Sequence, residues 1–416
     1  MGGNDSRDNH RRVSGDERME TIRELCSFEN RLAGSDAERR AANRLAERLR
    51  GTGRRVDVEP FYVHPQMPLV EAFHCFLAFA GSLVSIASPP AGFAMVLLAA
   101  TSMYLDLNAR FYVLRRLFFR RASQNVVARG ARPDAPARLI LTAHLDAGRT
   151  GSSFRPRRVR LAKRLDSLLP FPFGPFRYLF WSAAVLLPIL GFRLAGADSN
   201  GVSFLQLPFT LVLLVGIFAL VEVQLSGVVP AANDNASGVA TALGLAQALD
   251  ADPPARLDVW VLLTGGEESL MEGMHGFLRR HRKSLEKEST YFLNIDSVGG
   301  GDVRFIASEG LAVSIDADSR LLELCDAIAT ADRENGDRFG AQALRTGFAT
   351  DALPASLAGY PATTITCVEA GELLPPHYHL PTDVPSAVSP EALDRAQGFA
   401  LELVRALDRD LARRTA

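Results

Sequence analysis

Over most of the chain, short apolar runs alternate with segments in which apolar residues recur every three or four positions. Residues 17–52 show this helical spacing, whereas residues 54–61 alternate like a strand. Over residues 122–150, and again from residue 228 onward, strand-like apolar runs alternate with segments of helical spacing. This alternation predicts an α/β fold with a mixed, mostly parallel sheet sandwiched by helices.

The individual elements follow from the same pattern. Helices are predicted at residues 236–250, 271–281, 319–331 and 389–414, and strands at residues 124–130, 137–146, 256–264, 290–296, 302–307 and 360–367. Because ligands of such sheets collect beyond the carboxyl ends of the strands, the residues that follow each strand are the first candidates for a site.

Two stretches interrupt the α/β pattern. Residues 72–105 contain no charged side chain, and Pro89-Pro90 divides them into two halves, as at the tip of a hairpin. Residues 178–192 and 199–221 form a second pair of apolar segments, of which the later is long enough to cross a bilayer. Buried core helices, amphipathic surface helices and shallow insertion are the alternatives. The length and pairing of the runs favour two helical hairpins, or about four transmembrane helices.

Arginine and lysine residues border both apolar regions, and the two predicted tips hold only Arg193. The positive-inside rule therefore predicts that both flanks and the α/β domain attached to them are cytoplasmic, in a multi-pass membrane protein. The N-terminus shows no apolar region of a secretory signal, in agreement with this orientation. The basic residues are Arg110, Arg115, Arg116, Arg120 and Arg121 after the first hairpin, and Arg155, Arg157, Arg158, Arg160, Lys163 and Arg164 before the second.

These patterns divide the chain into four parts. Residues 1–16 are predicted to be a disordered N-terminus. Residues 66–121 and 151–227 are the two membrane hairpins with their basic flanks. The α/β domain is assembled from the three remaining segments, residues 17–65, 122–150 and 228–416.

Composition adds little beyond exclusions. The 416 residues carry a formal net charge of −1, and no zinc-finger spacing or RNA-binding signature is present, so we expect no nucleic-acid partner. The four cysteines are far apart and form no CxxC pair, which agrees with a reducing compartment. The chain is long enough for one large core plus additions.

Side chains suited to metal binding lie just beyond several predicted strands. They are His144 and Asp146, Glu267 and Glu268, Asp296, and His377 and His379, joined by Asp234 ahead of a predicted helix. Histidines and carboxylates that meet at one edge of a sheet are suitable ligands for divalent metals. So many carboxylates would raise one another's pKa values, and two divalent ions would remove this conflict. Two neighbouring metals can polarise a carbonyl and activate a shared water.

Taken singly, each residue also has a structural explanation. Asp234 is suited to cap the helix that follows it, and Asp146 and Asp296 are suited to turns. His144 is suited to a hydrogen-bonded position in the core, and His379 to an exposed loop. Their joint placement is what favours a metal site.

These motifs resemble those of the co-catalytic zinc exopeptidases, which include bacterial leucyl-type aminopeptidases and glutamate carboxypeptidase II. "AHLDAG" is similar to the H-x-D motif of that family, "NDNASG" to its bridging-aspartate motif and "GGEES" to its Glu-Glu motif. "NID" is similar to its third-strand aspartate and "YHLPTD" to its final histidine. The resemblance covers residues 17–65, 122–150 and 228–410 in motif order, and it implies a zinc aminopeptidase-like fold that hydrolyses peptide bonds.

The resemblance also implies a ligand set for two zinc ions per chain, other divalent metals being possible. Asp234 would bridge both ions. His144 and Asp296 would complete one site, and Glu268 and His379 the other.

Further roles are implied for the neighbours of these ligands. Glu267 would be the general base that passes a proton from water to the leaving amine. Asp146 would orient His144, and Asp383 would do the same near His379. The peptide bond between Asp234 and Asn235 would be cis.

The chain departs from the family at both hairpins, which the family does not need. His377 is a rival of His379 as a ligand, and His379 is favoured because Tyr-His followed by Asp383 matches the family arrangement. Residues that contact the substrate are left open among Glu309, Arg345, Asp351 and Tyr378.

The favoured function is a membrane-anchored zinc exopeptidase, and an aminopeptidase in particular. An amidohydrolase or carboxypeptidase acting on a modified or non-peptide amide is the alternative. A non-catalytic binding protein and a glutaminyl cyclase are less favoured, because every motif position is filled. The expected partners are a peptide or amide substrate and membrane lipid around the hairpins, and the oligomeric state is open.

Overall fold

The computed structural model describes residues 17–108, 111–166, 174–197 and 200–414. The segment predicted to be disordered, residues 1–16, lies outside the described residues. In the described part, nine strands form one sheet in the order β1-β2-β4-β3-β5-β9-β6-β7, with β8 paired to β6. The strands are β1 Arg55–Val63, β2 Arg121–Arg129, β3 Ala137–His144, β4 Leu257–Thr264, β5 Thr290–Ile295, β6 Asp302–Glu309, β7 Ile315–Asp316, β8 Gln342–Arg345 and β9 Ala362–Val368.

Parallel pairing occupies the centre of the sheet. Strands β4, β3, β5 and β9 run parallel to one another, so their carboxyl ends meet at one edge. Antiparallel pairs join β2 to β4 on one side and β6 to β9 on the other. The mixed sheet expected from the sequence is therefore present, with its parallel part where a site is expected.

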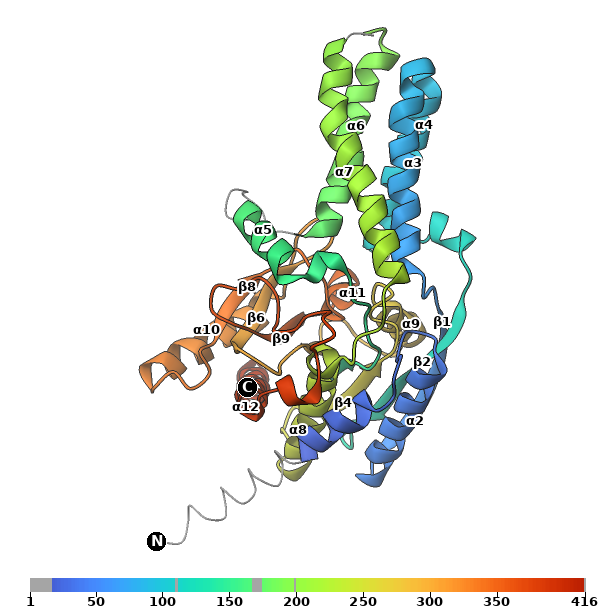
Figure 1. The fold of residues 1–416 in the computed structure, drawn as a ribbon. Coiled ribbons are helices and arrows are strands. Elements are labelled where there is room, and N and C mark those ends of the chain that lie inside the picture. The colour runs from blue at the N-terminus through green and yellow to red at the C-terminus, as the bar shows by residue number, and fades with distance from the viewer. Residues whose placement is uncertain (1–16, 109–110, 167–173, 198–199, 415–416) are drawn as a thin grey trace, which may run out of the picture.

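Helices cover both faces of this sheet (Figure 1). Alternate residues of β3 point to opposite layers, so that Leu139 and Leu141 pack on one face and Ile140 packs on the other. The first face is covered by the helix at residues 17–26 and by α2 Asp36–Gly51, α8 Gly238–Ala251, α10 Ser319–Glu334 and α12 Pro390–Arg414. The second is covered by α9 Glu272–His281 and α11 Ala352–Leu357, together with the apolar hairpins.

The helical prediction for residues 17–52 is wrong in its middle, because residues 27–35 form a turn rather than helix. Asn30 and Gly34 both have positive φ angles, 56° and 70°, which helix does not allow. Ser35 then caps α2 by accepting a hydrogen bond from the backbone N–H of Glu38.

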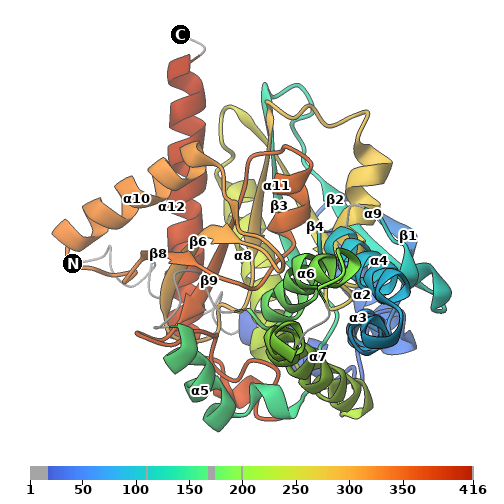
Figure 2. The same ribbon diagram turned by 90° about the horizontal axis from the view of Figure 1, so that it is seen from above.

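The hairpins are four helices: α3 Met67–Ala87, α4 Pro89–Leu107, α6 Pro175–Leu194 and α7 Asn200–Leu225. All four are long and apolar enough to cross a membrane. They pack against one another as one four-helix bundle, which stands on one side of the α/β body with both tips at its far end (Figure 1). The view from above shows the four bundle helices end on (Figure 2), and buried residues of each belong to the same apolar cluster as those of α9 and α11. The basic segment before the second hairpin forms a separate helix, α5 Pro156–Asp166.

Candidate metal centre

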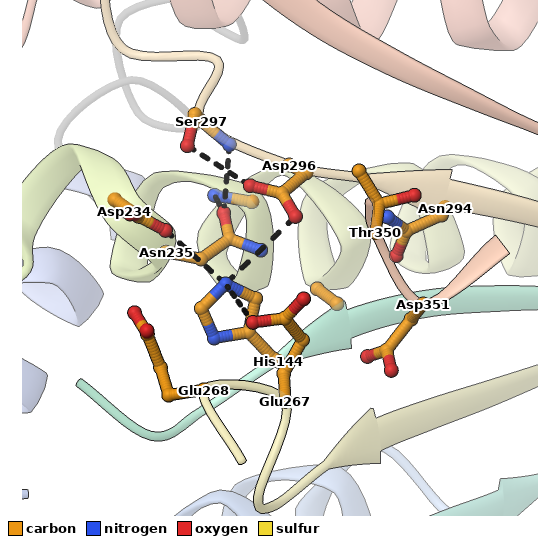
Figure 3. A network of polar contacts seen from close by, with 12 residues as sticks. His144, Asp234, Asn235, Glu267, Glu268, Asn294, Asp296, Ser297, Thr350 and Asp351 are labelled. Atoms are coloured by element: carbon orange, nitrogen blue, oxygen red, sulfur yellow. Dashed lines mark hydrogen bonds and ion pairs between the residues drawn. The ribbon is translucent and has the colours of Figure 1, made fainter. Parts of the chain in front are cut away.

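The five predicted ligands converge at the carboxyl edge of the parallel strands. Figure 3 shows four of them, His144, Asp234, Glu268 and Asp296, with Glu267 beside them. His144 is the last residue of β3, and Asp296 directly follows β5. Glu267 and Glu268 follow the end of β4, where Gly266 has a φ of 63° that turns the chain back over the edge. The sheet register therefore brings together side chains that are distant in sequence.

The ligand candidates form two clusters that share Asp234. In one cluster, His144 Nε2 lies 3.2 Å from Asp234 Oδ1 and 3.8 Å from Asp296 Oδ2. In the other, His379 Nε2 lies 3.4 Å from Asp234 Oδ2 and 3.4 Å from Glu268 Oε1. The two oxygens of Asp234 thus face different clusters, as a bridging carboxylate requires.

The donor set of each cluster fits a zinc ion. Each supplies one imidazole nitrogen and two carboxylate oxygens, and its three ligand atoms all lie within 4.8 Å of one another. Zinc in catalytic sites accepts this kind of nitrogen and oxygen set and leaves a position open for water. The residues present therefore fit one ion in each cluster.

The charges of these side chains also call for cations. Burial, reinforced by neighbouring carboxylates, raises the pKa of Glu268 to about 7 and that of Asp296 to about 6. Burial alone would lower the pKa of His144, but Glu267, Asp146 and Asp234 raise it well above its usual value. Raised pKa values of carboxylates and of a histidine result when many negative groups are buried together without a compensating positive charge. Bound cations would supply that charge.

Glu267 belongs to neither cluster. Its Oε2 lies 4.0 Å from His144 Nε2, and its side chain lines both cavities that adjoin the clusters. Burial and the charges of Glu268 and Asp351 raise the pKa of Glu267 well above its usual value, against the attraction of His144. A carboxyl group with a raised pKa beside a metal cluster is suited to accept and release a proton.

Asp146 and Asp383 are fully buried and support the clusters through the backbone. Asp146 accepts hydrogen bonds from the backbone N–H groups of Glu267 and Glu268, each at 3.1 Å. Its Oδ1 also lies 3.5 Å from His144 Nδ1. Asp383 accepts from the N–H groups of Asn233 and Asp234, at 2.6 and 3.1 Å, so it supports the bridging aspartate rather than His379 directly.

The peptide bond between Asp234 and Asn235 is cis, as the resemblance implies. The Asn235 side chain donates to the carbonyl of Ile295 at 3.0 Å and accepts from the N–H of Ser297, also at 3.0 Å. These bonds tie the loop that carries Asp234 to the strand end that carries Asp296. The position of the shared ligand Asp234 relative to Asp296, its partner in the first cluster, is therefore fixed.

The two candidate histidines of the final motif are separated by the structure. His379 Nδ1 donates to the carbonyl of Arg149 at 2.8 Å, and this bond presents Nε2 to the second cluster. His377 is bound to Thr382 Oγ1 instead and joins no cluster. Gly148 allows the close approach, because a Cβ there would lie 2.4 Å from Glu268 Oε1 and 2.5 Å from His379 Cε1.

The four candidate substrate residues differ in their placement. The Tyr378 ring packs beside His379 with a centroid separation of 4.3 Å. Asp351 accepts a hydrogen bond from Thr264, and Glu309 accepts one from the backbone N–H of Thr350, so both are buried close to the clusters. Arg345 has a side chain that is 68% exposed and pairs with Asp316, away from the site.

Two site residues were not foreseen. The ring of Phe154 lies 4.5 Å from that of His379, so the second insertion contributes directly to the site. Glu38 is buried and accepts hydrogen bonds from Ser123 Oγ and from the N–H of Gly266, just ahead of the two glutamates. The motif Ser35-x-x-Glu38 signals only a helix cap. No local pattern marks Phe154.

A third group of possible ligands, Glu71, His74 and Asp106, lies in the bundle near its base. The guanidinium of Arg115 already supplies a positive charge there, with its Nε 2.7 Å from Asp106 Oδ1 and its Nη2 3.9 Å from Glu71 Oε1. These residues therefore form a buried ion-pair network. Arg115 Nη1 also donates to the carbonyl of Ser269, which directly follows the glutamate pair.

Two cavities adjoin the clusters. The larger, of about 500 Å³, is lined mainly by apolar residues of α6 and α7 and ends at Glu267, Glu268 and His379. The smaller, of about 70 Å³, is lined by His144, Asp296 and residues of β6 and β9. Glu267, Glu268 and Tyr378 line both cavities, so a bound group at the clusters would have room on either side.

The sheet, its covering helices and the paired ligand clusters resemble those of zinc metallopeptidases with an aminopeptidase-like fold. Residues 220–404 match the model of Peptidase family M28. No curated protein gives a significant match to the chain.

Solved structures show the same fold. A zinc-dependent exopeptidase from Parabacteroides distasonis is 14% identical, with a TM-score of 0.54, 94% of this chain and 97% of that chain being covered. The zinc aminopeptidase BSAP from Bacillus subtilis is 14% identical, with a TM-score of 0.53 and 94% of each chain covered. A glutaminyl cyclase from Bacteroides thetaiotaomicron is also 14% identical, with a TM-score of 0.53, 94% of this chain and 97% of that chain being covered.

The expected fold class is thereby confirmed, and the match over residues 220–404 supports the co-catalytic zinc exopeptidase family and the zinc metallopeptidase class. The division of the chain into domains and the roles of the individual site residues stay predictions.

Proposed function

We propose that the protein is a membrane-anchored aminopeptidase that uses two zinc ions per chain to hydrolyse amide bonds. The observation that carries this proposal is the pair of ligand clusters that share Asp234. His144 and Asp296 would hold one ion, and Glu268 and His379 the other. When bound, the two ions supply Lewis acidity and lower the pKa of water.

The chain's own residues then divide the remaining work. Glu267 takes a proton from the attacking water and passes it to the leaving amine, a role that its raised pKa and open position support. Asp146 holds the backbone of Glu267 and Glu268 in place. The packed rings of Phe154 and Tyr378 shield His379 from bulk water.

Three observations favour this function over its alternatives. A carboxypeptidase requires an arginine for the terminal carboxylate, but Arg345 pairs with Asp316 away from the site, and Arg149, which lines the larger cavity, binds the carbonyl of Ser226. A glutaminyl cyclase, which uses one zinc, would not need a second complete ligand cluster that shares a bridging aspartate. A non-catalytic descendant of the fold has no reason to keep the unligated Glu267 beside complete clusters.

The membrane part of the proposal rests on the four apolar helices and on the basic residues at their base. With the positive side inside, the catalytic body lies in the cytoplasm against the membrane surface.

The direct test combines metal analysis with Glu267→Gln. Purified wild-type protein should contain close to two zinc ions per chain. The variant should keep both, since Glu267 belongs to neither cluster, and should lose roughly a factor of 10²–10⁴ in kcat on leucine amides, as expected for a general base. Glu59→Gln, at a buried carboxyl of β1 that binds His281 rather than the site, is the control and should keep its activity. One zinc or none after reconstitution would refute the two-metal site, and full activity of the variant would remove Glu267 as the base.

A further inference from the structure

We propose that the substrate is an amide carrying a long hydrocarbon chain, and that this chain occupies the larger cavity after entering from the apolar face of the bundle. The inference rests on the proposed function, because it names the substrate class of the same site. Hydrolysis itself is unchanged: the amide C–N bond breaks, the hydroxyl of water goes to the acyl carbon, and the remaining proton of that water goes to the leaving amine.

The cavity connects two different environments. One end is formed by Glu267, Glu268 and His379 of the metal centre. The other end is formed by helices of the bundle, including Leu179 of α6 and Leu220 of α7. At about 500 Å³, it falls within the roughly 300–1,000 Å³ of a small-molecule site. The bundle therefore forms one wall of the catalytic site.

The far end of the cavity opens on the outer face of α7. Leu211, Val212 and Val215 line the cavity and are nevertheless 49%, 39% and 67% exposed. Among the four candidate spans, α7 has the smallest buried share, 22%, so most of its apolar surface faces outward. In a bilayer this surface contacts lipid tails, so an acyl or alkyl chain can pass from the lipid into the cavity without crossing water.

The lining selects a hydrocarbon rather than a peptide. The charged side chains among its lining residues are Arg149, Glu267 and Glu268, with His379 beside them at the metal end. Arg149 Nη1 is bound to the carbonyl of Ser226, so it is directed toward the end of α7. Backbone amides of an extended peptide would remain without partners along the apolar part, whereas methylene groups gain from burial there.

The smaller cavity suits the short side of the same amide. Its volume is about 70 Å³, and Ser297 and Thr350 line it together with apolar residues of β6 and β9. Because both cavities meet at Glu267, Glu268 and Tyr378, an amide at the clusters would direct its compact end into one and its chain into the other.

The test compares substrates that differ only in chain length. One arm uses leucine ethyl, butyl, octyl and dodecyl amides, in which the chain leaves with the amine. The other uses N-acyl leucines of the same lengths, in which the chain stays on the acyl carbon. We expect kcat/KM to rise about fourfold for each buried methylene in one of the two arms. The arm that responds identifies the side of the amide that faces the membrane.

Two variants separate binding in the cavity from simple partitioning into the membrane or detergent. Ala219→Trp fills the cavity from α7, and Val215→Trp does so from a more exposed position that tolerates bulk. Each should lower the ratio of kcat/KM for the dodecyl over the ethyl substrate by about tenfold or more, which is the loss of about two methylene contacts. Ala94→Trp, on the exposed face of α4 and not in the lining, should leave that ratio unchanged.

The outcomes distinguish the inference from the function on which it rests. Zinc-dependent hydrolysis of the ethyl substrates with no dependence on chain length in either arm would overturn the inference alone. An equal fall of the ratio in Ala94→Trp and in both cavity variants would also overturn it. Absence of zinc-dependent hydrolysis for all substrates would overturn the proposed function as well.

Discussion

Asp383 stabilises the position of the bridging ligand Asp234 by accepting hydrogen bonds from two backbone N–H groups. Its carboxylate is fully buried and accepts from Asn233 and Asp234. Asp383→Ala would leave both donors unsatisfied, at about 1–3 kcal/mol each, and would release the backbone of the bridging ligand. We expect zinc affinity to fall about 10–100-fold, as measured by competition with a chromophoric chelator. Asp318→Ala, which removes a similar backbone acceptor on α10, is the control, and equal zinc affinities of the two variants would contradict the prediction.

His275 makes stability sensitive to acid. Burial, assisted by the charges of Arg279 and Arg115, lowers its pKa from 6.5 to about 3. Below pH 6.5, His275 therefore binds a proton in the unfolded chain but not in the folded chain. The contribution of His275 to stability is complete above pH 6.5 and is lost as the pH falls from 6.5 toward 3. The loss is at most about 1.4 kcal/mol per pH unit.

The variant His275→Phe isolates this effect. Its free energy of unfolding should decline less than that of the wild type between about pH 7.5 and about pH 5, because the replaced side chain binds no proton in either state. Denaturant unfolding at several pH values measures the difference, with His377→Phe as the control at an exposed histidine. Parallel pH profiles of wild type and His275→Phe would refute the assignment.

For single residues, the sequence predicted the site where the position of a residue at the end of a strand determines which edge of the sheet it reaches. His144, Asp296 and the glutamate pair follow strands, and parallel strands deliver their ends to one edge. Phe154 could not be found in this way, because its contact with His379 depends on how an insertion folds back over the site.

Arg115 links the bundle to the catalytic loops. It is fully buried in the short helix at Leu114–Leu117, where it binds Asp106 of α4 and the carbonyl of Ser269. Its Nη1 also lies 3.7 Å from Glu272 Oε2 at the start of α9. The surrounding carboxylates raise the pKa of Arg115 further, against the effect of burial, so its charge is permanent. One side chain therefore joins the base of the first hairpin to the segment that carries Glu268.

Arg115→Met would leave these buried carboxylates without a counter-charge. We expect a loss of about 3–5 kcal/mol in the free energy of unfolding, seen as a lower Tm in detergent. The matched control is Arg116→Met, since the neighbouring arginine is exposed and lies over the ring of Phe111. Equal Tm values for the two variants would show that Arg115 does not stabilise the fold as the counter-charge of these carboxylates.

For the elements, hydropathy indicated the four apolar helices and periodicity indicated most strands. The strands β7 and β8 have 2 and 4 residues, and α11 has 6, too few for a period to show. Nothing local indicated that the hairpins would form a single bundle. Their association depends on contacts between segments distant in sequence, such as the hydrogen bond of 2.6 Å between the hydroxyl groups of Ser82 in α3 and Thr210 in α7.

For the whole molecule, the two apolar hairpins, which interrupt the α/β pattern of the sequence, determine how a substrate reaches the site. The α/β pattern predicted the sheet and its edge. It could not predict that α6 and α7 would stand over that edge and wall the larger cavity, because this placement is set by tertiary packing between distant segments.

The arrangement of charge along the long axis argues for one membrane orientation. The exposed arginines of α5, among them Arg157 and Arg160, lie beside the base of the bundle (Figure 1). The opposite end carries the tips at Pro90 and Ala195, and Arg193 near the second tip is buried against Gln206. Basic groups at the base favour the anionic cytoplasmic leaflet, while the nearly uncharged tips cross with little cost.

Cysteine labelling tests this orientation. In a background with Cys26→Ser, since the other three cysteines are buried, a membrane-impermeant maleimide should label Pro90→Cys and Ala195→Cys in intact cells. Leu161→Cys, whose side chain is 58% exposed on α5, should react only after the membrane is opened. Tips that react only after permeabilisation would show that the hairpins do not cross, in which case the outer face of α7 would meet only the near leaflet. Labelling of Leu161→Cys in intact cells, with both tips protected, would place the catalytic body on the outside and reverse the charge argument.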